Sequence, residues 1–169
     1  GILFVVAAGN SANNIDKGGA SASYPAGNTC VTRSDGASRG WDCIVTVAAV
    51  DSTGALASFS NYGATGVDLG APGVNILSLS PGDSYQSMNG TSMAAPHVTG
   101  AIALCASMNP GLNARTLRSV LLAAVAPTAS LAGKTVTGGR LDIGAMVDRC
   151  LNAGPGVTSV SPPSGSSGD

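Results

Sequence analysis

The stretch NGTSMAAPHVTG, residues 89–100, places a serine at the start of a predicted helix and the only histidine of the chain five residues later. The helix is predicted to run from about Ser92 to Met108, where the letters NPG end it. A serine at such a place is usually only an N-cap. The same place also suits a nucleophile, because the free N–H groups and the positive dipole of a helix start stabilise an oxyanion beside the hydroxyl. Ser92 is therefore a candidate catalytic residue, with an N-cap as the alternative.

His97 is not expected to act as the base for Ser92. Along a helix, an interval of five residues rotates a side chain by about 140° and raises it by about 7.5 Å. A general base must come within about 3 Å of the hydroxyl proton. We therefore expect His97 to point into the protein beside Val98, Ala101 and Ile102, as a hydrogen-bonded core histidine. A base for Ser92 would have to come from elsewhere.

Apolar runs before this helix predict a parallel sheet that is buried on both faces. ILFVVAAG (2–9) and CIVTVAAV (43–50) are continuous and rich in β-branched residues. GVDLGAPG (66–73) predicts a short third strand. Residues 74–80 and 84–90 flank the turn letters PGD and predict a hairpin.

Two further helices are predicted after the one that starts at Ser92. One has Asn113 as its N-cap and runs to about Ala126, with a stripe of apolar residues on one face. The other lies within RLDIGAMVDRCL, residues 140–151. Strands that alternate with helices in this way indicate a layered α/β fold.

The composition bounds the class of protein. A chain of 169 residues suits one domain with a real core. Charged residues make up only 10% and the net charge is −1, which argues against an electrostatic surface for nucleic acid. The longest apolar run, ILFVVAA, is far shorter than the roughly 18 residues of a membrane helix, so we expect no membrane partner.

The ends of the sequence suggest how the domain is bounded. Residues 1–153 are assigned to the domain, which opens directly on a buried strand and is therefore expected to be a processed chain or part of a longer one. Residues 154–169, GPGVTSVSPPSGSSGD, are rich in Gly, Ser and Pro and are predicted to be a linker or a disordered tail.

The four cysteines are Cys30, Cys43, Cys105 and Cys150, and no two of them form a CxxC pair, so a zinc site is poorly supported. They allow three disulfide pairings. Pairing Cys30 with Cys43 would close a polar loop and contribute roughly 3 kcal/mol in the chain-entropy model. Cys105 and Cys150 could join two helical segments. Four free thiols are the alternative.

Several motifs together resemble one family. NGTSMAAPHVTGAIAL (89–104) resembles the serine motif of the subtilisin-like serine proteases (subtilases), and VVAAGN (5–10) is similar to their oxyanion-hole strand. Four more segments fall in the family's order: SYPA (23–26), IVTVAAVD (44–51), ASFSNYG (57–63) and LGAPGVNILS (69–78). The resemblance covers residues 2 to about 150. It implies a subtilisin-like three-layer α/β fold, with a mostly parallel sheet between helices, of which only the C-terminal half is present.

The resemblance also implies roles for single residues. Ser92 would be the nucleophile, and Asn10 would donate to the oxyanion together with the backbone N–H of Ser92; a plain turn residue is the alternative for Asn10. A neutral amide suits that role because it donates without carrying a charge of its own. The implied substrate-binding residues are Ala7, Ala8 and Gly9 as a wall of the specificity pocket, Ser23 near its base, and Asn89 and Gly90 along the cleft.

No cofactor is implied, although a structural calcium ion is possible. Asp68, with carbonyl groups near Pro25, resembles a cation-site position of some subtilases, and a solvated or hydrogen-bonded Asp is the alternative. The peptide bond before the proline that matches Pro25 is often cis in this family.

The implied function is that of a secreted serine endopeptidase acting on polypeptides through an acyl-enzyme on Ser92. In the family, the catalytic Asp and His precede the strand on which this sequence opens. They would therefore come from an N-terminal part of the same protease domain, and this chain alone is expected to be inactive. The alternatives are a non-catalytic subtilase-like module for binding or scaffolding, and an unrelated α/β domain with a capped helix.

Overall fold

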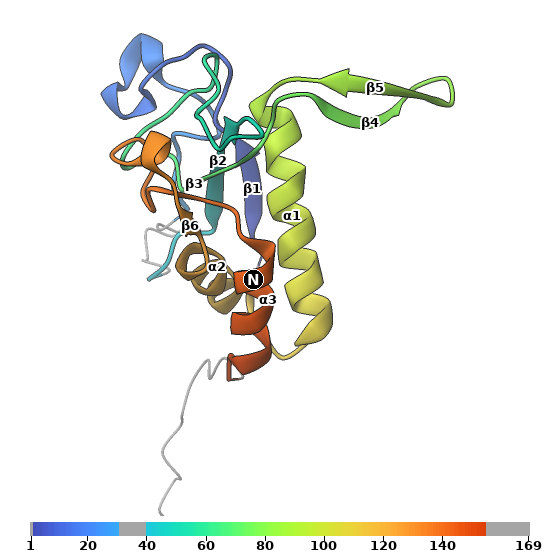
Figure 1. The fold of residues 1–169 in the computed structure, drawn as a ribbon. Helices are drawn as coiled ribbons and strands as arrows, with labels where there is room; N and C mark the ends of the chain where they lie inside the picture. Colours follow the sequence, from blue (N-terminus) through green and yellow to red (C-terminus); the bar gives the residue numbers. More distant parts are fainter. Residues whose placement is uncertain (1, 31–39, 155–169) are drawn as a thin grey trace, which may run out of the picture.

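The structure is a computed structural model that describes residues 2–30 and 40–154, and it has the predicted α/β architecture (Figure 1). Within these ranges, five strands form a mostly parallel sheet. In order across the sheet they are β1 (Phe4–Ala7), β2 (Ile44–Val50), β3 (Leu69–Pro72), β7 (Gly139–Arg140) and β6 (Ala126–Pro127). All neighbours are parallel except β6 and β7. The three strands predicted from the apolar runs are therefore confirmed.

Strand β2 is buried on both faces, which explains why its sequence is apolar apart from Thr46. Every residue from Val45 to Val50 is at most 2% exposed, because both faces of the strand are covered. Val45, Val47 and Ala49 belong to a core cluster shared with the helices, whereas Ala48 belongs to a second cluster on the opposite face. An alternating pattern would have placed polar side chains in one of these clusters.

Three helices pack on the first face. They are α1 (Thr91–Met108), α2 (Ala114–Ala123) and α3 (Ile143–Asn152). Helix α1 contacts β1, β2 and β3 and turns Ala94, Val98, Ala101 and Cys105 toward the sheet, which is the spacing of one helical face. Helix α3 packs against both α1 and α2.

The helix boundaries agree with the predictions except at two ends. Asn113 caps α2 as predicted, and its Oδ1 accepts a hydrogen bond from Thr116 N at 2.9 Å. The prediction that this helix reaches Ala126 was wrong: it ends at Ala123, because Ala126 pairs with Arg140 in the sheet. Arg140 therefore lies in β7 and not in the third helix, whose N-cap is Asp142.

The second face of the sheet is covered differently in the described residues. Ala8, Ile15, Ala26, Ala48 and Val67 form its cluster. The covering segments are loops that contain two short 3-10 turns, η1 (Ile15–Lys17) and η2 (Gly19–Ser21); a third such turn, η3 (Ala129–Leu131), follows β6. The sheet is thus flanked by helices on one face and by loops on the other.

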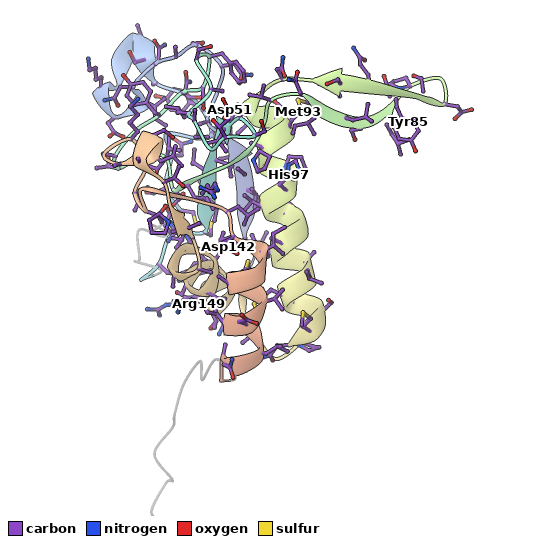
Figure 2. The ribbon with its side chains drawn as sticks, in the orientation of Figure 1. Asp51, Tyr85, Met93, His97, Asp142 and Arg149 are labelled. Atoms are coloured by element: carbon purple, nitrogen blue, oxygen red, sulfur yellow. A yellow bond between two sulfur atoms is a disulfide. The ribbon has the colours of Figure 1, made fainter. Side chains whose placement is uncertain are left out.

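The predicted hairpin is present and projects from the body of the molecule beside the start of α1 (Figure 1). Strands β4 (Ile76–Ser80) and β5 (Ser84–Met88) pair antiparallel, and the side chains of Leu77, Leu79 and Tyr85 are exposed. Figure 2 shows Tyr85 far out on this hairpin, whereas Met93 and His97 lie near the start of α1.

Covalent features match the expectations that the described residues can test. Disulfides join Cys30 to Cys43 and Cys105 to Cys150, so the alternative of four free thiols is wrong. The Tyr24–Pro25 peptide bond is cis.

None of the helices in the described ranges has both the length and the hydropathy needed to cross a bilayer. The predicted tail, 154–169, lies outside the described residues apart from Gly154.

Candidate active site

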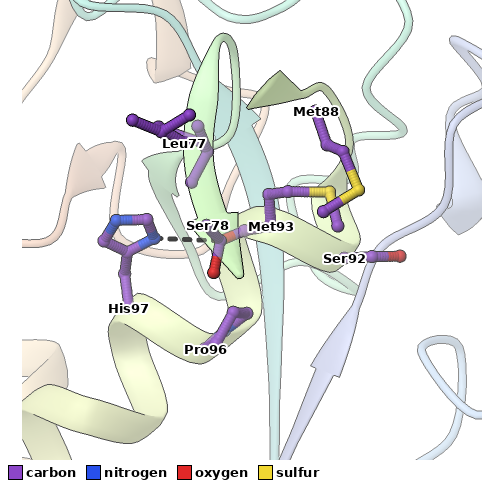
Figure 3. A pocket seen from close by; sticks show the side chains of 8 residues that line it. Leu77, Ser78, Met88, Ser92, Met93, Pro96 and His97 are labelled. Atoms are coloured by element: carbon purple, nitrogen blue, oxygen red, sulfur yellow. Dashed lines mark hydrogen bonds between the residues drawn. The ribbon is translucent and has the colours of Figure 1, made fainter. Parts of the chain in front are cut away.

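Ser92 is the second residue of α1 and is exposed, as a nucleophile must be. It lines a cavity of about 320 Å³ between the helix and the hairpin (Figure 3). Met93, Pro96 and His97 line the same cavity from α1, and the base of the hairpin supplies Ile76, Leu77, Ser78 and Met88. The cavity therefore offers a mostly apolar wall next to the Ser92 hydroxyl, with Ser78 and His97 as its other polar side chains.

In the first turn of α1, the backbone N–H of Ser92 is left without an acceptor among the described residues. The N–H groups at a helix start have no partner inside the helix, so each needs another acceptor. Thr91 N donates to Asn10 Oδ1 at 2.9 Å, and Met93 N and Ala94 N donate to Gly90 O at 3.0 and 3.3 Å. Among the described residues, the structure shows no acceptor for Ser92 N. This N–H therefore remains available at the positive end of the helix.

Asn10 follows β1 and has its carboxamide fixed by Thr91. Its Oδ1 accepts from Thr91 N at 2.9 Å and from Thr91 Oγ1 at 3.0 Å, so this atom is the acceptor end of the group. Within the described ranges no acceptor is found for Asn10 Nδ2. The side chain is exposed, and it presents its donor end to solvent.

Gly90 shows that these two donors border the same space. A Cβ atom built on Gly90 would lie 3.5 Å from Asn10 Nδ2 and 3.7 Å from Ser92 N. Both donors, together with Met93 Sδ at 3.5 Å, therefore lie on the side of Gly90 toward which a side chain would project. Two donors without a protein acceptor on one side of a glycine are the kind of groups from which an oxyanion hole is built.

The predicted wall residues are brought to the same end of the sheet. A Cβ on Gly9 would lie 3.2 Å from Ser23 Oγ, so Ser23 lies against Gly9 as expected. Ala8 is completely buried, whereas Ala7 and Gly9 keep exposed surface. The methyl group of Ala8 belongs to the core, and its place in the wall of the specificity pocket stays a prediction.

The two residues before the helix differ in what they do. Gly90 is buried at the space described above. Asn89 is exposed, but its Oδ1 accepts from Asn75 N at 2.6 Å and so closes the base of the hairpin. Asn89 therefore has a structural role in addition to its predicted place along the cleft.

The prediction for His97 was half right. His97 makes no hydrogen bond to Ser92; its Nδ1 lies 2.9 Å from Met93 O, and the two side chains point in different directions (Figure 3). The expectation of a core histidine was wrong, because His97 is only half-buried and lines the cavity. Val98 and Ala101 take the sheet-facing stripe of α1, which places His97 on the flank of the helix.

Asp68 is buried and already bonded by protein groups. Its Oδ2 accepts from Thr46 N at 2.7 Å, and its Oδ1 forms an ion pair with Arg118 Nη2 at 2.8 Å. Burial raises the pKa of the Asp68 carboxyl above its ordinary value, and the bond from Thr46 and the charge of Arg118 offset part of that rise.

These contacts bear on the expected cation site. The Ala26 carbonyl, next to Pro25, accepts from Thr46 Oγ1 at 3.0 Å. No group of three or more His, Cys, Asp or Glu side chains in the described ranges could hold a metal ion. Asp68 and Ala26 are thus each bonded to protein donors in this structure. The hydrogen-bonded alternative describes Asp68 in this structure, and the cation site stays a prediction.

Two residues at the site were missed from the sequence. Thr91 is fully buried, accepts from Gly9 N at 3.1 Å and donates to Asn10. Asn61 is also buried, and its side chain bonds to the loop around Asn10. The only sequence signal for either was its place inside a quoted motif, which does not reveal partners roughly 50 or more residues away.

Comparisons with known proteins agree with this geometry. The model of the subtilase family matches residues 1–145. Subtilisin BL of Lederbergia lenta is 45% identical over 121 residues, which are 72% of this chain and 38% of that protein. An extracellular protease of Xanthomonas campestris pv. campestris is 45% identical over 117 residues, 65% of this chain and 17% of the relative. The chain thus spans less than half the length of these curated relatives.

Solved structures give the same relation. The crystal structure of the A-subunit of the AB5 toxin from E. coli has a TM-score of 0.75 and 28% identity, covering 88% of this chain and 50% of that chain. The sheet and the helices described above thus recur together in a known fold.

Proposed function

The chain belongs to the subtilase family, and on that premise we propose that it carries the nucleophile and the oxyanion hole of a serine endopeptidase. Ser92 Oγ attacks the carbonyl carbon of a peptide bond while its proton passes to a base. The C–N bond then breaks, and the amine leaves with a proton. Water hydrolyses the remaining ester, which releases the acid product and restores Ser92.

One observation carries the proposal. Asn10 Nδ2 and Ser92 N lie on the same side of Gly90, at 3.5 and 3.7 Å from the position of its missing Cβ. In the tetrahedral intermediate the former carbonyl oxygen becomes negative, and two fixed donors stabilise that charge more than they stabilise the neutral carbonyl. The position of Ser92 at the positive end of an 18-residue helix acts in the same direction.

The base and its orienting acid are proposed to come from a part of the protein outside this chain. The one histidine of this chain is His97. Its Nδ1 is hydrogen-bonded to Met93 O, and it makes no hydrogen bond to Ser92. The proposed substrate is a polypeptide, which would lie against Gly9, Ser23 and Gly90. Secretion is part of the proposal as well, because the Xanthomonas relative is an extracellular protease and two disulfides suit an oxidising compartment.

The alternative is a non-catalytic subtilase-like module that binds or scaffolds. It is favoured by the absence of a base near Ser92 among the described residues. The sequence upstream of residue 1 in the gene distinguishes the two: an Asp motif and a His motif there support the enzyme.

The test is hydrolysis of unfolded casein by the full-length protein, compared with its Ser92→Ala and Ser87→Ala variants. Ser87 is an exposed serine on β5 that does not line the cavity, so its removal serves as the matched control. We expect loss of hydrolysis in Ser92→Ala alone. Equal activity in Ser92→Ala and wild type would overturn the proposal.

A further inference from the structure

We propose that Asn61 is a positioning residue that holds the loop carrying Asn10 from both sides and so fixes the oxyanion hole. The inference rests on the proposed function for its catalytic consequence. The contacts themselves are independent of that function.

The side chain of Asn61 bonds to the backbone before and after Asn10. Its Oδ1 accepts from Ser11 N and from Asn13 N, both at 3.0 Å, and its Nδ2 donates to Ala8 O at 2.9 Å. Asn61 is 4% exposed, so water cannot replace these bonds. One amide thus satisfies three backbone groups that flank Asn10, without touching Asn10 itself.

The backbone of the same segment makes further hydrogen bonds to the loop. Asn61 N donates to Gly9 O at 2.8 Å, and Ala12 N donates to Phe59 O at 2.8 Å. A Cβ on Gly9 would overlap Asn61 Nδ2, so only glycine lets the two segments approach this closely. The loop and the Asn61 segment are therefore matched to each other.

The loop needs an external support because its own conformation is unfavourable. Ala12 has φ of 53°, in the left-handed region that costs a residue with a Cβ roughly 1 kcal/mol or more. Asn10, Ser11 and Ala12 are all exposed, so packing does not hold them.

The support is itself anchored to the sheet. Ala57 N donates to Ala49 O at 2.9 Å, and Ser60 Oγ accepts from Ala49 N at 3.0 Å, which ties the segment before Asn61 to β2. Thr91 orients the Asn10 carboxamide from the helix side. Asn10 is thereby held by α1 at its side chain and by the sheet, through Asn61, at its backbone.

A positioning role predicts a specific kinetic signature. A donor displaced by a fraction of an ångström binds substrate as before but stabilises the oxyanion less, so kcat falls while KM changes little. We expect Asn61→Leu, which removes the three side-chain bonds, to lower kcat about 10-fold and to change KM less than about twofold.

The test uses the full-length protein, a peptide p-nitroanilide and a double-mutant cycle with Asn10→Ala. If Asn61 acts through Asn10, Asn61→Leu lowers kcat less than about twofold once Asn10 is already Ala. An equal loss in both backgrounds would mean that Asn61 only stabilises the fold, and no loss in either would equally overturn the proposal. Thr135→Val is the matched control: it removes one buried side-chain bond, to Gly138 N, that does not involve the loop, and should leave kcat unchanged.

A second readout does not depend on activity. Hydrogen exchange of the Ser11 and Asn13 amides should become at least about 10-fold faster in Asn61→Leu. Asn61→Asp keeps the acceptor for both amides and should keep most of their protection, which covers the case in which Asn61→Leu does not fold. Unchanged exchange in both variants would overturn the proposal. If the wild type cannot hydrolyse peptides, the proposed function fails, while exchange still decides whether Asn61 holds the loop.

Discussion

Asn10 Oδ1 accepts two hydrogen bonds from one residue, from the backbone N–H of Thr91 at 2.9 Å and from its hydroxyl at 3.0 Å. Thr91 Oγ1 in turn accepts from Gly9 N at 3.1 Å. The first residue of α1 is thus bonded to two consecutive residues, Gly9 and Asn10, of the segment that follows β1. It decides which end of the Asn10 amide faces the space beside Ser92.

Replacing Thr91 by Val keeps the shape of the side chain and removes the hydroxyl that bonds to Gly9 N and to Asn10 Oδ1. Gly9 N then loses its acceptor, a side chain that is fully buried. We therefore expect the free energy of unfolding to fall by about 1–3 kcal/mol. Because Asn10 also loses one of its two donors, kcat should fall about 10-fold with little change in KM. Denaturant unfolding and steady-state kinetics measure the two effects. Thr91→Ser, which keeps the hydroxyl, should recover most of kcat; a Ser variant as slow as the Val variant would contradict this role.

Gly90→Ala tests the space between the two donors. The added methyl group would lie 3.5 Å from Asn10 Nδ2 and 3.7 Å from Ser92 N, and would crowd the two donors that are proposed to bind the oxyanion. We expect kcat to fall about 100-fold or more, the loss that subtilisin itself shows when one oxyanion donor is removed. Gly133→Ala is the control, since Gly133 also has a positive φ but nothing lies near its missing Cβ. Equal kcat values for the two variants would contradict the proposed position of the oxyanion.

The Asp68–Arg118 pair predicts how stability depends on pH. An acid whose pKa is higher in the folded than in the unfolded state stabilises the fold while it is protonated, and this contribution is lost as pH rises through the folded-state pKa. The pKa of Asp68 is raised, first by burial. The free energy of unfolding of the wild type should therefore fall relative to that of Asp68→Asn as the pH rises from the acid side of an ordinary aspartate pKa toward neutrality.

Arg118→Met sharpens this test. Without the guanidinium at 2.8 Å, the pKa of Asp68 rises further and the loss of stability moves to higher pH. Arg115→Met, at an exposed arginine on the same helix, should leave the profile unchanged. Urea unfolding between pH 4 and pH 8 gives the comparison, at roughly the pH range where buried carboxyls titrate. Parallel profiles for wild type and Arg118→Met would rule out the assigned cause.

The two disulfides are predicted to contribute unequally. Cys105 and Cys150 are separated by 45 residues, and Cys30 and Cys43 by 13. In the chain-entropy model these loops correspond to about 4 and about 3 kcal/mol. Replacing Cys105 and Cys150 together by Ala should therefore destabilise the protein more than replacing the other pair, as measured by denaturant unfolding without reductant. The reverse order would contradict the entropic account.

Local patterns in the sequence predicted most of the elements. The apolar runs at 2–9 and 43–50 predicted two strands, and Asn113 carries the N-cap signal in its own side chain. Only β2 is buried on both faces as expected: β1 lies at the edge of the described sheet, and its Phe4 is 52% exposed. The end of α2 could not be found in this way, because Ala126 joins the sheet through Arg140, a partner 14 residues later. A long-range pairing overrode a local helical pattern.

The part of the site that could be predicted is the part that local sequence motifs describe. Ser92 follows from its place at a helix start and from the surrounding motif. His97 was misplaced because helix geometry excludes it as a base but does not say which flank of α1 stays half-exposed. The role of Asn61 was invisible, since it arises only when a loop about 50 residues earlier folds around its side chain.

The central claim is that Ser92 is the nucleophile of the full-length protein. It is tested most directly by treating that protein with a fluorophosphonate, digesting it and mapping the adduct by mass spectrometry. One adduct on the peptide that contains Ser92, absent from Ser92→Ala and present in Ser87→Ala, is the expected result. No adduct on the folded wild type, or an adduct that persists in Ser92→Ala, would contradict it.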